Sequence, residues 1–84
     1  MLQVIFYTKD DCPLCDEAEA LLLLLESDYN LAVEKRDIHT NDEWLERYQL
    51  QIPVIDINGK QLTCEEISYE SLEQLIKETI TTSS

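Results

Sequence analysis

Two cysteines with two residues between them, Cys12 and Cys15, are the residues whose type and spacing point most directly to chemistry. They stand between a predicted strand and a predicted helix, where unpaired N–H groups and a partial positive charge favour thiolate over thiol. The pKa of a cysteine in such a place can fall from about 8.5 to between about 3.5 and about 7.5. The spacing puts both sulfurs on one helix face, within reach of a disulfide. We predict thiol–disulfide exchange in which Cys12, at the exposed cap, attacks and Cys15, one turn inside, resolves the mixed disulfide.

A zinc site is the alternative chemistry for a cysteine pair. Four ligands would require the third cysteine, Cys64, and the only histidine, His39, to converge on the pair, and the spacing does not support that. We expect His39 to be a polar turn residue. Cys64 is expected to be a small buried side chain at the end of a strand, with a redox or regulatory role as the lesser alternative.

The apolar pattern predicts the elements that position the pair. Residues 2–7 are β-branched and aromatic, which is typical of an interior strand covered on both faces. Pro13 fits the first turn of a helix, where a missing N–H costs nothing. Leucines at helical spacing carry this helix to about Glu26. We expect its leucine run to be buried on a broad face, with an exposed Leu23 and Leu24 patch for a partner as the alternative.

The middle of the chain predicts a strand and a short helix. Residues 31–38 form the strand, which a right-handed crossover would place parallel to the first. Thr40 and Glu43 have the spacing of a capping box, in which each side chain satisfies the other's backbone N–H. The apolar positions of the short helix that follows include Trp44 and Tyr48.

The last third of the chain predicts a hairpin and a helix. Residues 52–57 form a strand, and the Asn-Gly pair at 58–59 predicts a tight turn that returns residues 60–64 antiparallel. Ser68 is placed to cap the last helix. The Thr-Thr-Ser-Ser end has nothing to bury, so residues 81–84 are expected to be a disordered tail.

Length, charge and cysteine count exclude several classes of protein. The 84 residues fit one domain, which we place at residues 1–80 as an α/β fold of order βαβαββα, with a four-stranded mixed sheet flanked by three helices. The 18 acidic against 6 basic side chains argue against nucleic acid or an anionic membrane as partner. The longest apolar run, residues 20–25, is far below the ~20 residues of a membrane span. No secretory start is visible, and the odd cysteine count does not suit a secreted scaffold, so we expect a cytoplasmic protein.

The segment Tyr-Thr-Lys-Asp-Asp-Cys-Pro-Leu-Cys at residues 7–15 resembles the active-site segment of glutaredoxins, in which a lysine commonly stands three residues before C-P-x-C. Ile52-Pro53-Val54, followed by Asn-Gly, resembles the segment with the cis-proline of glutaredoxins and thioredoxins. The leucine of the motif and the Asp-Glu-Ala after it are most similar to a small group of bacterial glutaredoxin-like proteins with C-x-L-C. The resemblance covers nearly the whole chain up to about Ile80.

The resemblance implies a thioredoxin fold with sheet order 2-1-3-4 and a cis Pro53 that faces the two sulfurs. It implies Cys12 and Cys15 as the catalytic couple. Ile52 would pair with the substrate backbone, and Lys9 would be the cation nearest the thiolate or a substrate carboxylate. The expected substrate-binding residues are Lys9, Pro13, Leu14, Ile52 and Pro53, with Thr8 and Cys64 as further candidates.

The sequence departs from glutaredoxins proper at three places, the first of which is Leu14, where an aromatic residue is usual. Gln51-Ile52 stands before the cis-proline, where glutaredoxins usually have Thr-Val. Residues 63–67, which include two carboxylates, stand after the hairpin, where glutaredoxins have a Gly-Gly pair. In addition, residues 9–19 set Lys9 against five carboxylates. One carboxylate at ~8 Å opposes a thiolate by about 1 kcal/mol before salt screening. We therefore predict that Cys12 is less acidic than in most glutaredoxins and that this surface repels anionic glutathione.

The expected function is that of a thiol–disulfide oxidoreductase that reduces protein or low-molecular-weight disulfides. We expect a monomer with no bound cofactor or metal, and with glutathione or a thioredoxin-reductase system as the possible electron donor. Two alternatives stay open. One is a non-catalytic thioredoxin-fold adaptor or redox sensor for a protein partner, and the other is a metal site at the cysteines.

Overall fold

The structure is a computed structural model that describes residues 2–82. Its elements follow the predicted order, with one short 3₁₀ turn added before the second helix. In chain order they are β1 (Leu2–Thr8), α1 (Pro13–Asp28), β2 (Leu31–Asp37), η1 (Ile38–Thr40), α2 (Asp42–Tyr48), β3 (Val54–Ile57), β4 (Lys60–Leu62) and α3 (Tyr69–Thr82).

The four strands form one mixed sheet in the order β2-β1-β3-β4. β1 pairs parallel with β2, while β3 pairs antiparallel with both β1 and β4. β1 is therefore the interior strand that its apolar sequence predicts. The order and directions confirm the thioredoxin fold that the resemblance implied.

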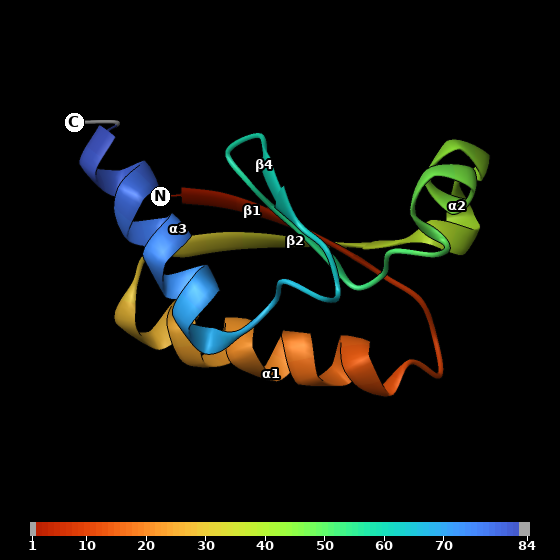
Figure 1. Ribbon diagram of the computed structural model, residues 1–84, viewed down its shortest axis with the longest axis horizontal. Helices are drawn as coiled ribbons and strands as arrows, with labels where there is room; N and C mark the ends of the chain where they lie inside the picture. Colours follow the sequence, from red (N-terminus) through yellow and green to blue (C-terminus); the bar gives the residue numbers. More distant parts are fainter. Residues whose placement is uncertain (1, 83–84) are drawn as a thin grey trace.

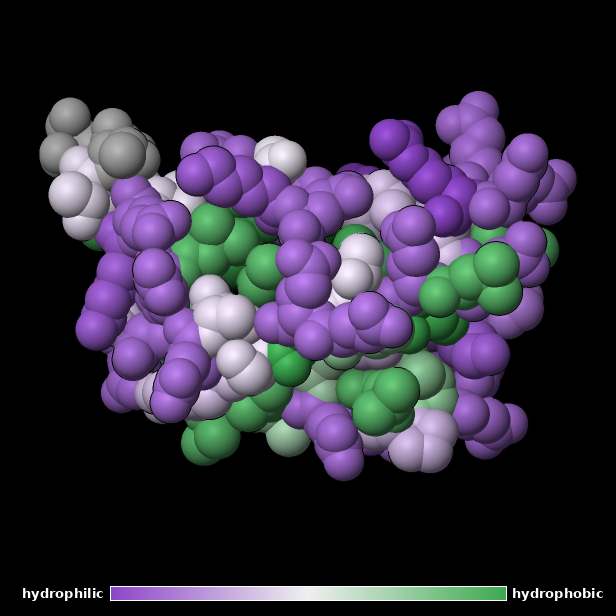
Figure 2. All heavy atoms as spheres, in the orientation of Figure 1, coloured by the Kyte–Doolittle hydropathy of each residue, from purple (hydrophilic) through white to green (hydrophobic). Residues whose placement is uncertain are grey.

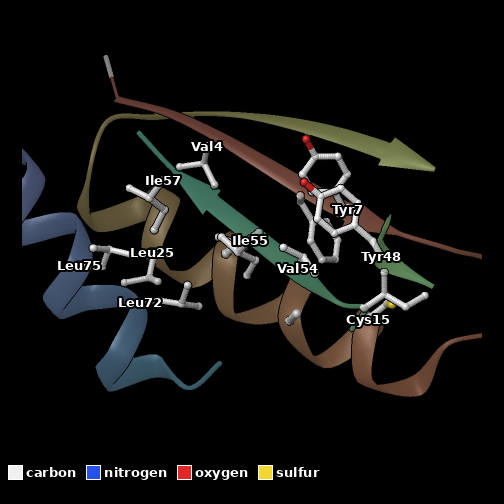
Figure 3. Packing of buried hydrophobic residues seen from close by; sticks show 14 of the residues in the cluster. Val4, Tyr7, Cys15, Leu25, Tyr48, Val54, Ile55, Ile57, Leu72 and Leu75 are labelled. Atoms are coloured by element: carbon white, nitrogen blue, oxygen red, sulfur yellow. The ribbon is translucent and has the colours of Figure 1, made fainter. Parts of the chain in front are cut away.

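Helices cover the two faces of the sheet unequally. α1 and α3 lie together on one face, and α2 covers only one end of the other face (Figure 1). The main core lies between the sheet and the helix pair, where Val4, Ile55, Leu25 and Leu72 are fully buried (Figure 3). The fold thus leaves one broad side of α1 without a covering layer.

That arrangement explains the fate of the leucine run. Leu22 and Leu25 are buried, whereas Leu23 and Leu24 are 62% and 57% exposed. The expectation of a broad buried face is therefore wrong, because α1 packs on the sheet along a single face. The alternative, an exposed patch at these two leucines, fits the structure better.

The start of α2 is capped differently from the prediction. Asn41 is the N-cap, and its side-chain oxygen accepts hydrogen bonds from the backbone N–H groups of Glu43 at 2.9 Å and Trp44 at 3.3 Å. Thr40 belongs to η1 and donates its hydroxyl to the Asp37 carbonyl at 2.7 Å. The predicted capping box is therefore wrong by one residue, because η1 uses the Thr40 side chain.

The tight turn and the last cap agree with the prediction. Asn58 and Gly59 both have positive φ, at 53° and 92°, as the hairpin signal requires, and the Asp56 carboxylate accepts from the Gly59 N–H at 2.9 Å. Ser68 caps α3, since its hydroxyl accepts from the Ser71 N–H at 3.1 Å.

Several element ends differ by a few residues. α1 continues to Asp28, and β2 ends at Asp37. β3 and β4 are shorter than predicted, because the residues before Val54 and after Leu62 make turn contacts instead of ladder bonds. α3 continues to Thr82, so residues 81 and 82 are helical and were wrongly assigned to the tail, while the rest of that prediction, residues 83 and 84, lies outside the described residues.

Candidate active site

The cysteine pair lies at the junction of β1 and α1. Cys12 is the N-cap of α1, and Pro13 occupies the first turn. The two sulfurs form a disulfide, with the Cα atoms 5.1 Å apart, which is within the usual range for a bridged pair. The backbone N–H of Cys15 donates to the Cys12 sulfur at 3.2 Å. Cys12 thus lies where a helix N-terminus favours a negative sulfur.

Burial separates the two cysteines less than predicted. Cys12 is 9% exposed and Cys15 is 2% exposed. The expectation that Cys12 sits at an exposed cap is wrong, because it packs into the core with the end of β1. Cys12 is nevertheless the more exposed of the two, which suits it to meet an incoming disulfide first.

A small hollow of about 130 Å³ lies beside the first turns of α1, and we call it the proline groove. It brings together three predicted site residues, Leu14, Pro53 and Cys64. The Ile52–Pro53 peptide bond is cis, as the resemblance to glutaredoxins and thioredoxins implied. The full lining is Leu14, Glu17, Ala18, Leu21, Pro53, Cys64 and Ile67.

Cys64 differs from its prediction. It follows β4 in a turn instead of ending the strand, and it is half-buried with a free thiol. Its backbone N–H donates to the Gln51 carbonyl at 3.1 Å, which ties the turn after β4 to the loop before Pro53. Cys64 itself lines the proline groove.

A second hollow, of about 320 Å³, lies on the other side of α1, and we call it the acidic hollow. It contains Thr8, Lys9 and Cys15. The two hollows fall on opposite sides because their α1 residues differ by about half a helical turn. The other lining residues are Asp10, Asp11, Asp16, Glu19, Lys35 and Asp37.

The two lysines of the acidic hollow have different surroundings. Lys35 pairs with Glu19 at 3.0 Å, and the hydrogen bond to that carboxylate raises the pKa of Lys35. Lys9 is exposed and forms none of the ion pairs found within residues 2–82. The negative charge predicted around the cysteine pair therefore gathers in the acidic hollow. Lys9 is the lysine of this hollow that has no ion pair among the described residues.

Two backbone hydrogen bonds attach the loop before Pro53 to the end of α2. The Tyr48 carbonyl accepts from the N–H groups of Gln51 at 2.8 Å and Ile52 at 3.0 Å. The N–H of Ile52 is thereby occupied within the protein. Ile52 was expected to pair with a substrate backbone, and with its N–H bonded to Tyr48 its carbonyl is the backbone group that remains for such a pairing.

An aromatic cluster supports this end of the sheet from the α2 face, and sequence reasoning did not identify it. The rings of Tyr7 and Tyr48 stack with centroids 4.2 Å apart, and Trp44 meets Tyr7 edge-on at 6.0 Å. Arg36 lies over Tyr7 and Trp44 and donates to the Tyr7 hydroxyl at 3.1 Å. Burial raises the pKa of Tyr7. Figure 3 shows Cys15 at the same end of the sheet as this stack.

The position of His39 and of the possible metal ligands bears on the alternative of a metal site. His39 is exposed in η1, as predicted for a polar turn residue. Within residues 2–82 no three His, Cys, Asp or Glu side chains are arranged to hold a metal ion. Over the same residues, no helix is long and apolar enough to cross a membrane.

Comparison with solved structures defines the class of the fold. The chain superposes on a structural-genomics target protein from X. campestris with a TM-score of 0.76, at 24% identity, over 89% of this chain and 96% of that one. It superposes on a variant of the thioredoxin-like protein BC3987 with a TM-score of 0.66, at 24% identity, over 87% and 97% of the two chains. For a thioredoxin variant from Halobacterium salinarum the values are 0.67, 22%, 92% and 73%. The chain therefore has a thioredoxin-like fold with a cysteine pair at disulfide distance.

The family follows from the sequence profile. The family described as Glutaredoxin-like domain (DUF836) matches residues 3–77. This protein belongs to that family, which confirms the resemblance seen in its motifs.

Proposed function

We propose that this protein is a thiol–disulfide oxidoreductase that reduces disulfides through the Cys12/Cys15 couple. The observation that carries the proposal is the Cys12–Cys15 disulfide at the N-terminus of α1, with the Cys15 N–H directed at the Cys12 sulfur. A disulfide between residues three apart adds little to the core of this fold. A bridge of this kind is suited instead to repeated reduction and re-formation by thiol–disulfide exchange.

The reaction transfers two electrons to the substrate in two exchanges. The Cys12 thiolate attacks one sulfur of a substrate disulfide, a Cys12–substrate bond forms, and the other substrate sulfur leaves as a thiolate and takes a proton from water. The Cys15 thiolate then attacks the Cys12 sulfur, which releases the second substrate thiol and regenerates the disulfide. Two thiol equivalents from an external donor return the protein to its dithiol form.

The protein's own groups divide this work. The helix N-terminus stabilises the Cys12 thiolate. Buried Cys15 is held one turn away and is protected from direct contact with bulky disulfides. The Ile52 carbonyl beside Pro53 can accept a hydrogen bond from a substrate backbone. In the proposed function the protein acts as a monomer, without a bound metal or organic cofactor, on a disulfide-containing protein or small molecule.

Reduction of the oxidised protein by a defined electron donor tests the proposal. The oxidised protein is offered two NADPH-coupled systems in parallel, glutathione with its reductase and a thioredoxin-reductase system. We expect NADPH consumption that requires both cysteines, with the thioredoxin-reductase system faster because acidic side chains surround the pair and oppose anionic glutathione. Glu26→Gln, on the exposed surface of α1 and outside both hollows, is the matched control and should retain the rate. Reduction by neither system, or a Cys12→Ser variant as active as the wild type, would refute the proposal and favour an adaptor role.

A further inference from the structure

We propose that the proline groove selects protein disulfides flanked by an apolar residue and a basic residue, and that Glu17 determines this preference. The inference rests on the proposed function and specifies its substrate class. It is carried by the groove's size, its walls and the position of its one carboxylate.

The size of the groove favours a single side chain. Its volume is about 130 Å³. Sites that enclose a whole small-molecule ligand usually measure about 300 Å³ or more. The groove can therefore take one side chain of an extended protein segment, while the remainder of that segment lies on the surface.

The walls of the groove favour an apolar side chain. Leu21, Pro53 and Ile67 line it, and Leu14 lies at its edge with 55% of its surface exposed. Figure 2 shows apolar atoms over the half of α1 nearest its N-terminus, bordered by hydrophilic side chains. An apolar residue that covers Leu14 removes this surface from water, which contributes to binding in proportion to the area covered.

The charge of the groove favours a basic neighbour for that residue. Glu17 is the one charged residue in the lining, and it forms none of the ion pairs present within residues 2–82. Glu65 and Glu66 are exposed in the turn that also carries Cys64. The Glu66 carboxylate accepts hydrogen bonds from Thr63, which keeps it at the turn. A cation on the substrate therefore meets Glu17 in the groove, and Glu65 and Glu66 add negative charge in the neighbouring turn.

A substrate carboxylate has no matching partner at the groove. Lys9 and Lys35 belong to the acidic hollow on the opposite side of α1, where Lys35 already pairs with Glu19. The lining of the groove contains no lysine or arginine. The same surface that attracts a basic segment therefore opposes an acidic one.

The test compares three peptide disulfides of equal length that differ only in their flanking residues, which are basic, neutral or acidic. The rate at which each oxidises the reduced protein is measured at low and high salt. We expect the basic peptide to react faster than the acidic one, with a ratio that shrinks at high salt. Glu17→Gln should reduce the ratio about threefold, as expected for removing one charge near the encounter site.

Glu26→Gln is the matched control, since this exposed glutamate lies on α1 but outside the groove. It should leave the basic-to-acidic ratio unchanged. Equal rates for the three peptides, or an equal effect of the two glutamine variants, would overturn the inference and leave the proposed function standing. Failure of all three peptides to oxidise Cys12 would overturn both.

Discussion

Reduction of the Cys12–Cys15 disulfide should destabilise the folded protein only slightly, by about 1 to 2 kcal/mol. The bridge joins residues three apart, so the loop it closes is very short. In the chain-entropy model, closing a loop of this length removes about 2 kcal/mol of freedom from the unfolded state at 25 °C. Reduction restores that freedom and thereby lowers the free energy of unfolding.

Part of this loss should be recovered by the reduced sulfur itself. The Cys15 N–H already donates to the Cys12 sulfur at 3.2 Å. A thiolate at this cap gains about 0.3 to 1 kcal/mol from the helix N-terminus. The recovery depends on ionisation, so the difference between the oxidised and reduced forms should widen as the pH falls and the thiolate is protonated.

Urea unfolding of the two forms at about pH 9 and at about pH 7 measures this difference, because the contribution of the thiolate is present above the ordinary cysteine pKa of about 8.5 and is lost below it. For a chain of this size, 1 kcal/mol corresponds to a shift in melting temperature of about 4 to 8 °C, so calorimetry can measure it too. The Cys12→Ser/Cys15→Ser double variant should not respond to reductant, and Cys64→Ser should keep the full difference. A reduced form that is as stable as the oxidised form at both pH values would refute the reasoning, as would a difference that narrows with acid.

Three further predictions test how the site is supported. Asn41→Ala should lower the free energy of unfolding by about 1 kcal/mol, because Asn41 accepts two N–H bonds at the start of α2. Thr40→Ala should lower it by less than half of that. A larger drop in the urea midpoint for Thr40→Ala than for Asn41→Ala would show that Thr40 is the cap, as the capping box requires. Leu25→Ala should cost about 2 to 5 kcal/mol and exposed Leu24→Ala about 0.5 kcal/mol or less, so equal costs would show that α1 faces the sheet differently. Burial raises the pKa of Tyr7 above 10.0, so the folded state favours the neutral phenol and stability is lost as the pH rises through the unfolded value. Tyr7→Phe should therefore flatten the fall of the urea midpoint between about pH 9 and about pH 11, and an unchanged slope would contradict this.

Local patterns predicted the fold because each one has a short-range cause. The apolar run of β1 requires a central strand, and Asn58-Gly59 requires a tight turn wherever the hairpin packs. Errors arose where two neighbouring residues compete for one role. Thr40 and Asn41 can both cap a helix, and only the presence of η1, which uses the Thr40 hydroxyl, decides between them.

The candidate site was predictable in part. The position of Cys12 at the start of α1 follows from its place between a strand and Pro13. The proline groove does not follow from the sequence, because Leu14, Pro53 and Ile67 are far apart in the chain and meet only through packing. Likewise, the exposure of Leu23 and Leu24 depends on which side of α1 has a second layer, and periodicity within one helix does not reveal that.

The central claim is that Cys12 attacks and Cys15 resolves, and trapping of the mixed disulfide tests it most directly. Reduced Cys15→Ser protein, in a Cys64→Ser background, is mixed with a neutral peptide disulfide and its intact mass is measured with time. The account predicts one peptide adduct on Cys12 that persists, while protein with both cysteines intact releases the peptide and ends as the internal disulfide. An equal adduct on the matching Cys12→Ser variant, or no adduct on Cys15→Ser, would contradict it.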